Sequence, residues 1–243
     1  MRFVSIFLVL VSGMANAGEH RIPDFDPDDA EEIMEVCAGC HGIHAQGTRD
    51  GEYPRLAGLA PAYLAREIQR PNPQQCRRGL PAYLAREIQL FKERKRINIP
   101  MIPYANDHEL PPEDVRTITA YLASIQLPRH MSPLEPGVAF DALARLEESK
   151  KVLNVSHYPG DPERGGRLYR KECGSCHGRH GEGDWEEHVP MLTGQHSDYL
   201  LRQIENIRKG ERLHDDPEDA ELFREYSDQD IADILAWLSW QDD

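Results

Sequence analysis

Apolar residues recur along most of this chain at the spacings of one helix face. Two such stripes in the later part of the chain consist of Tyr199, Leu200, Ile204 and Ile207, and of Ile231, Ile234, Leu235 and Leu238. Spacings of three and four residues are typical of amphipathic helices, whereas a half-buried strand alternates apolar and polar residues. No convincing alternation of that kind occurs, so the pattern predicts an all-α protein.

The predicted helices begin at sequences that favour helix starts. An acidic run from Asp28 to Glu32 suits the positive end of the helix dipole. Asp161-Pro162 and Ser227-Asp228 each combine a capping residue with a good first-turn residue, and Pro111-Pro112 marks a further start. These signals predict a helix ahead of each cysteine-rich motif and a final helix in each half of the chain.

The chain contains two similar halves. From His41 to Pro54 is 13 residues, and from His177 to Pro190 is also 13. Each proline opens a P-x-L-x-G sequence, and a predicted helix containing Tyr-Leu follows it. Residues 114–122 and 230–238 also resemble each other. We therefore predict an internal repeat of one small helical unit.

The segments of the chain follow from this repeat. Residues 1–17 read as a signal peptide, with an apolar run after Arg2 and an A-x-A cleavage sequence at Ala15-Asn16-Ala17. Residues 18–126 form the first predicted domain and residues 161–243 the second; we refer to them as the first and second halves. Residues 127–160 are rich in proline and form a predicted surface linker, with a short helix within residues 139–152.

A shorter duplication lies inside the first half. The nonapeptide from Pro61 to Gln69 recurs unchanged from Pro81 to Gln89, which makes a 20-residue insert near residues 70–89. Prolines between the copies break any continuous helix. We expect the second copy to form the native helix, and we interpret the insert, with its Cys76, as a tandem duplication or a sequence artefact rather than a functional element.

The charge of the chain restricts its partners. The formal net charge is −14, which disfavours binding to nucleic acid and to anionic lipid and favours protein partners with basic patches. No segment after the N-terminal run has the length of apolar sequence that a membrane-spanning helix needs. We therefore expect a soluble, exported protein without a membrane span.

Two C-x-x-C-H pentapeptides carry the candidate chemistry: Cys37 to His41 and Cys173 to His177. This spacing is the attachment signature of c-type haem. Cys37 and Cys40, and Cys173 and Cys176, are placed to form thioethers to the haem vinyl groups, while each histidine binds the iron. A zinc site, a redox dithiol and a disulfide are the alternatives, but none of them explains a histidine after both pairs.

Together, the motifs and the repeat resemble the dihaem class I cytochromes c of the c4 type. The resemblance covers most of the chain apart from the linker and the insert. It implies two tandem all-α domains, each around one haem c, with the chain near Pro54 and Pro190 able to hydrogen-bond His41 and His177. It also implies a methionine as the sixth ligand, in a loop before the last helix, where Met101 stands in the first half.

The second half departs from that pattern. Pro217 stands at the position that corresponds to Met101, and no methionine follows Met191. His214 is the best substitute ligand. Met191 lies inside the P-x-L-x-G sequence, which the family resemblance places on the proximal side of the haem. An open or water-bound sixth position is the remaining alternative.

The leading functional interpretation is an exported, periplasmic electron carrier rather than an enzyme. Haem 1, with His41 and Met101, is expected to have the higher potential, and haem 2, with His177 and His214, the lower. A second interpretation is the cytochrome subunit of a periplasmic dehydrogenase, which passes electrons towards an oxidase. A third is a small-ligand sensor or haem enzyme with an open site at haem 2.

Overall fold

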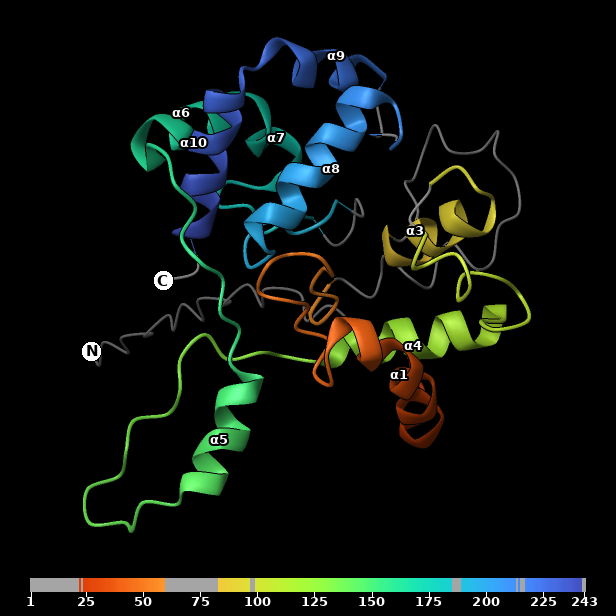
Figure 1. The fold of residues 1–243 in the computed structure, drawn as a ribbon, viewed down its shortest axis with the longest axis vertical. Helices are drawn as coiled ribbons and strands as arrows, with labels where there is room; N and C mark the ends of the chain where they lie inside the picture. The colour runs from red at the N-terminus through yellow and green to blue at the C-terminus, as the bar shows by residue number, and fades with distance from the viewer. Residues whose placement is uncertain are drawn as a thin grey trace, which may run out of the picture.

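The computed structural model describes residue 22 and residues 24–59, 83–96, 99–184, 189–212, 214 and 217–241. The regular elements of these residues are helices, and their β-structure consists of one bridge between Asp184 and Val189 (Figure 1). The prediction of an all-α protein is therefore confirmed. The predicted signal peptide, the first copy of the duplicated nonapeptide and Cys76 lie outside the described residues.

The described part of the first half contains α1 (Pro27–His41), α3 (Tyr83–Lys92) and α4 (Pro112–Ser124). The second copy of the nonapeptide enters α3, as expected. α1 packs against α4, and the core between them contains Met34, Val115, Ile118 and Leu122, each no more than 5% exposed. The apolar face of α4 thus packs against α1 and holds it in place.

The second half contains α6 (Pro162–Glu172), α7 (Gly174–His177), α8 (Ser197–Lys209), α9 (Pro217–Glu225) and α10 (Asp228–Ser239). α6 crosses α10 closely because α6 presents two glycines there. A Cβ atom on Gly165 would lie 1.8 Å from the carbonyl oxygen of Asp233. The two backbones are therefore so close at this point that only glycine fits. The Tyr169 and Trp237 rings pack beside this crossing with centroids 4.5 Å apart.

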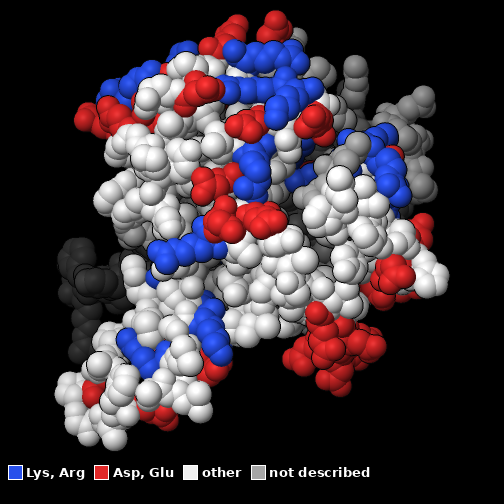
Figure 2. Space-filling model, viewed as in Figure 1, with Lys and Arg blue, Asp and Glu red and all other residues white. Residues whose placement is uncertain are grey.

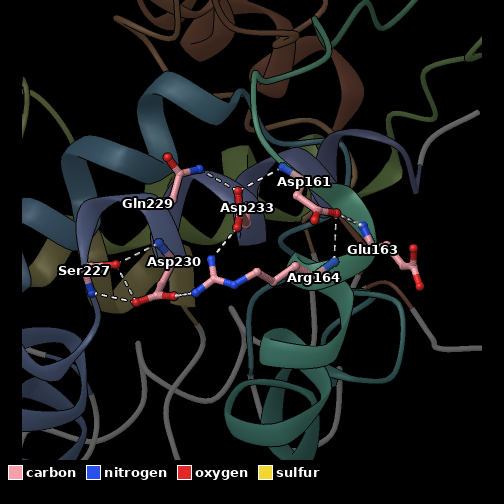
Figure 3. Close-up of polar contacts among 7 residues, drawn as sticks. All are labelled: Asp161, Glu163, Arg164, Ser227, Gln229, Asp230 and Asp233. Carbon is pink, nitrogen blue, oxygen red and sulfur yellow. Dashed lines mark hydrogen bonds and ion pairs between the residues drawn. The ribbon is translucent and has the colours of Figure 1, made fainter.

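A polar cluster fixes the crossing from its N-terminal end (Figure 3). Arg164 of α6 forms ion pairs with Asp230 and with Asp233, which is 1% exposed on α10. The backbone N–H of Asp161 also donates to the Asp233 carboxylate at 2.9 Å. Ser227 and Asp230 cap the start of α10 reciprocally. Burial raises the pKa of Asp233, but these hydrogen bonds outweigh it, so that its pKa is lowered overall.

A further helix, α5 (Ala142–Lys151), lies between the halves, within the predicted linker. It begins at Asp141, whose side chain accepts hydrogen bonds from the N–H groups of Leu143 and Ala144. The predicted short helix is therefore present, but α5 buries none of its residues and extends away from the other helices (Figure 1). None of the helices that the structure describes is long and apolar enough to span a bilayer.

Candidate haem sites

The first cysteine–histidine motif forms the last turn of α1. Cys37 and Cys40, three residues apart, occupy one face of the helix. His41 ends the helix and is buried, with 9% of its surface exposed. Its Nδ1 donates to the carbonyl oxygen of Pro54 at 2.9 Å. Since a carbonyl only accepts, Nδ1 carries the ring hydrogen, and Nε2 is left as the metal-binding nitrogen.

The second motif has the same arrangement at the junction of α6 and α7. Cys173 lies between these helices, and His177 ends α7. The Nδ1 atom of His177 donates to the carbonyl oxygen of Pro190 at 2.9 Å, so this imidazole has the same tautomer as His41. Both hydrogen bonds expected from the family resemblance are therefore present.

The two loops that follow the motifs have a common backbone structure. The N–H of Gly47 donates to the His41 carbonyl at 2.8 Å, and the N–H of Gly183 donates to the His177 carbonyl at 2.7 Å. Gly47 and Gly183 have φ values of 74° and 73°, which side chains rarely adopt, and a Cβ on either would lie 2.6 Å from a carbonyl oxygen of the loop. The glycines let each loop return to place its proline carbonyl under the histidine.

The protonation states suit metal binding by the first site. Burial lowers the pKa of His41, although the Pro54 carbonyl opposes this effect, so the imidazole is neutral near pH 7. Burial also raises the pKa of the Cys37 thiol to about 11. A thiolate is thus disfavoured at Cys37, whereas a neutral thioether has no charge to bury.

The alternatives to haem find no support in this arrangement. A structural zinc site needs both cysteine pairs at one metal, but no three His, Cys, Asp or Glu residues in the described part of the chain are grouped to hold a metal ion. No disulfide joins any of Cys37, Cys40, Cys173 and Cys176. Each motif therefore stands as a separate site with two thiols and one oriented imidazole.

The structure brings His214 close to His177. Their ring centroids are 6.1 Å apart, with 48° between the ring planes. The Phe223 ring of α9 contacts His214 edge-on at 5.4 Å between centroids. Pro217, the residue in the position of the missing methionine, begins α9. In the first half, Met101 is half-buried in a series of turns before α4, and its carbonyl accepts from Tyr104 and Ala105.

The loops that carry the two prolines also contact each other. The side-chain amide of Gln195 exchanges two hydrogen bonds with the backbone of Arg55, at 2.9 and 3.0 Å. The Arg55 guanidinium donates to the carbonyls of Ala57 and Gly194. His196 adds a further contact, at 2.8 Å, with the carbonyl of Gln46. These contacts join the two sites through the backbone that supports each histidine.

A buried polar cluster joins the halves at a second place, and the sequence analysis did not anticipate it. Arg96 pairs with Glu87, and donates to the hydroxyl of Tyr199 at 3.0 Å and to Gln203 at 2.9 Å. Arg212 donates to Gln203 at 2.8 Å and lies 3.6 Å from Glu87. Burial raises the pKa of Tyr199, but the charges of the two arginines outweigh it and lower the pKa overall.

The internal repeat relates the members of this cluster to each other. Glu87 and Gln203 are 116 positions apart (203 − 87), as are Arg96 and Arg212 (212 − 96). The members therefore come from equivalent positions of the two halves, with a carboxylate on one side and an amide on the other. Among the described residues, the guanidinium groups of Arg96 and Arg212 share this buried space with the carboxylate of Glu87.

Comparison with known proteins agrees with this geometry. The cytochrome c family matches residues 28–126 and 162–242, one stretch for each site. The chain belongs to the cytochrome c family. Because each stretch contains one complete attachment motif, this cytochrome carries two covalently bound c-type haems.

Two similar proteins match over most of the chain. A cytochrome c4 of Stutzerimonas stutzeri is 26% identical over 216 residues, which cover 87% of this cytochrome and 84% of the relative. A thiosulfate dehydrogenase electron acceptor of Stutzerimonas stutzeri (strain A1501) is 27% identical over 206 residues, which cover 84% and 78% of the two chains. This cytochrome is a dihaem, cytochrome c4-like electron-transfer protein.

Solved structures share the fold. Reduced recombinant cytochrome c4 from Pseudomonas stutzeri superposes with a TM-score of 0.56 at 20% identity, over 89% of this chain and 98% of that one. The thiosulfate dehydrogenase TsdBA of Marichromatium purpuratum gives 0.57 at 22% identity, over 87% of this chain and 39% of that one. The prediction of two tandem cytochrome c domains is confirmed.

Proposed function

We propose that this cytochrome is an exported, periplasmic electron carrier with unequal ligands at its two haems. Cys37, Cys40 and His41 hold haem 1 with Met101 as the sixth ligand. The second haem is attached through Cys173 and Cys176, with His177 and His214 as its iron ligands. Residues 18–126 and 161–243 are the corresponding domains, joined by the linker of residues 127–160.

The distance between His177 and His214 carries this proposal. A histidine nitrogen binds a transition metal at about 2 Å, and the ring centre lies about 1 Å beyond the nitrogen. Two imidazoles on opposite sides of one metal therefore have centroids roughly 6 Å apart. The separation of 6.1 Å between the two rings fits that arrangement.

The ligand residues determine how the two halves differ. When bound, a c-type haem supplies an iron that exchanges one electron between the ferric and ferrous states. A methionine thioether favours the ferrous state more than an imidazole does. Met101 therefore gives the first half the higher potential, and His214 gives the second half the lower one.

An acidic surface around α1 is suited to a basic protein partner. Its residues are Asp24, Asp26, Asp28, Asp29, Glu31, Glu32 and Glu35, all exposed. Figure 2 shows a red area at the position of α1. No lysine or arginine occurs from Asp24 to Thr48, and the exposed side chains of Val36 and Ile43 flank the first attachment motif. Charge steers the encounter, and the apolar side chains give contact area next to haem 1.

A second candidate function is that of a dehydrogenase partner. The similarity to a thiosulfate dehydrogenase electron acceptor over 84% of this chain favours it, as does the match to part of the longer TsdBA chain. The same ligands and the same acidic surface serve both roles. Reduction of the purified cytochrome by a thiosulfate dehydrogenase, at a rate that falls with increasing salt, distinguishes this candidate from a general carrier.

The deciding experiment measures the absorption spectrum of the ferrous holoprotein with and without carbon monoxide, together with a redox titration. If both irons have six strong ligands, carbon monoxide leaves the spectrum unchanged and the titration resolves two potentials. A shift in half of the haem contradicts ligation by His214 and favours a sensor or a haem enzyme at haem 2. Two equal potentials contradict the unequal ligand pairs.

A further inference from the structure

The segment between the halves exposes an unusual amount of apolar surface. Five of the ten large apolar side chains that are exposed among the described residues lie within thirteen positions: Leu134, Val138, Phe140, Leu143 and Leu146, which are 53–71% exposed. They belong to a closed loop, residues 128–153, which we call the extension. It contains α5 and is largely white in Figure 2. Apolar clusters of this kind mark interaction surfaces.

The extension has a defined structure of its own. At its base, the N–H of Leu153 donates to the carbonyl of Pro128 at 2.9 Å. In its middle, Arg145 pairs with Glu148 at 2.7 Å and donates to the carbonyl of Ser132 at 2.6 Å, while Glu148 accepts from the N–H of Ser132. Arg145 and Glu148 of α5 thus form their polar contacts within the extension. The apolar side chains remain directed outwards on a preformed surface.

The charge of the extension differs from that of the remaining chain. Its four basic residues are Arg129, Arg145, Lys150 and Lys151, and its four acidic residues are Glu135, Asp141, Glu147 and Glu148. The net charge of the extension is therefore zero (4 − 4), and the full −14 belongs to the other residues. Two copies of this protein repel each other wherever their acidic surfaces meet, but not at their extensions.

We propose that the extension is a homodimerisation surface, in which α5 packs antiparallel against α5 of a second copy. Leu143 and Leu146 are three residues apart and share one face of the helix. The acidic Asp141 begins α5, and Lys150 and Lys151 end it. Antiparallel pairing places the basic end of each helix beside the acidic start of the other and opposes the two helix dipoles, whereas parallel pairing places like charges together.

The contact is small, and the dimer is accordingly in exchange with the monomer. A ten-residue helix is about 15 Å long, so the pair with its flanking loop is at the lower end of specific interfaces. The acidic surface of α1 remains available in the dimer, because α1 and α5 extend in different directions from the molecule (Figure 1). The pairing thus leaves the proposed docking of a basic partner in place.

The test is sedimentation equilibrium of the holoprotein over a range of concentrations. We expect the weight-average mass to rise from that of one chain towards twice that value with increasing concentration. Raising the salt from about 20 mM to about 300 mM should strengthen the dimer, because it screens the repulsion between the acidic surfaces. Leu146→Glu should raise the dissociation constant about tenfold or more, because it places carboxylates in the apolar contact.

The matched control is Ala144→Glu, which adds the same charge to exposed α5 away from the stripe of Leu143 and Leu146 and should leave the dissociation constant within about twofold. A monomer at every concentration overturns the proposal, as does a dimer that Leu146→Glu leaves unchanged. A monomer that binds neutral phosphatidylcholine vesicles through Leu146 overturns it in favour of a lipid surface. Because this experiment measures mass, its result does not depend on whether the proposed electron-transfer function is correct.

Discussion

His214 lies with its ring 6.1 Å from that of His177, centroid to centroid, although 37 positions separate them in the sequence (214 − 177). α8 ends at Lys209 and is capped by Gly210 in the left-handed conformation, and α9 begins at Pro217. Phe223 of α9 then contacts His214 edge-on. In the proposed ligand set, His214 takes the place that Met101 has in the first half.

Replacing His214 with alanine should open one haem without detaching it. Cys173, Cys176 and His177 are unchanged, so the haem content should remain two per chain, while about half of the ferrous haem becomes able to bind carbon monoxide. Absorption spectra of the ferrous protein with the gas measure this. His180→Ala is the control, because His180 is exposed and hydrogen-bonds Gln241. A His214→Ala spectrum identical to that of the native protein excludes His214 as a ligand.

Replacing Met101 with leucine should affect the other haem. Leucine has a similar volume but no sulfur, so the fold is retained while the higher of the two potentials falls and that haem becomes open to carbon monoxide. A redox titration separates this from the His214 variant, which changes the lower potential. Met131→Leu, in the linker, is the control. If Met131→Leu and not Met101→Leu moves the higher potential, the assigned ligand of haem 1 is wrong.

Much of the site was predictable because it is encoded locally. The cysteine pairs, the histidines and their prolines lie within short stretches, and the family resemblance that these motifs carry implies both hydrogen bonds to His41 and His177. The start of α1 follows from the acidic run that begins at Asp28, and the starts at Pro162 and Asp228 follow from capping and proline signals. The helical period then decides the fold class without knowledge of distant contacts.

The contacts between the halves could not be read from the sequence in the same way. Arg96 meets Tyr199 and Gln203 over more than one hundred positions, and the amide of Gln203 looks like an ordinary helix-surface residue when α8 is considered alone. The sequence predicts a short helix in a surface linker, but it does not predict that α5 buries none of its residues. The spacing of Leu143 and Leu146 places both on one helix face, but it does not tell what that face contacts.

Replacing Arg96 with methionine should weaken the connection between the halves. Glu87 then keeps Arg212 at 3.6 Å but loses its direct pair, and a buried carboxylate without that partner costs about 3 kcal/mol or more. We expect the unfolding of the holoprotein to separate into two thermal transitions, measured by calorimetry. The control is Lys95→Met, at an exposed neighbouring position, which should unfold with the same calorimetric profile as the native protein. An unchanged profile in Arg96→Met argues that the loop contacts of Arg55 join the halves on their own.

Adding one carbon at the helix crossing should destabilise the second half. The Cβ of Gly165→Ala would lie 1.8 Å from the Asp233 carbonyl oxygen, which forces α6 away from α10 and costs about 3 kcal/mol of unfolding free energy. Chemical denaturation of the holoprotein measures this loss. Gly39→Ala, in α1, is the control: its Cβ meets nothing within 4 Å, and alanine favours the helix, so stability should rise slightly. Equal effects of the two variants would disprove the close crossing.

The Asp233 carboxylate should make stability depend on pH in the acid range. Its folded-state pKa is lowered, since the hydrogen bonds from Asp161, Arg164 and Gln229 outweigh the effect of burial, while the unfolded value is about 3.9. The stabilisation is therefore complete above that unfolded value and is lost as the pH falls through it towards the folded pKa.

Denaturation midpoints measured across the acid range should fall steeply in the native protein. In Asp233→Asn they should be lower near pH 7 and depend less on pH, whereas Asp29→Asn, at an exposed position of α1, should keep the native slope. If the pH dependence of the denaturation midpoint is unchanged in Asp233→Asn, the acid sensitivity comes from other carboxylates and not from the ion pair between Arg164 and Asp233.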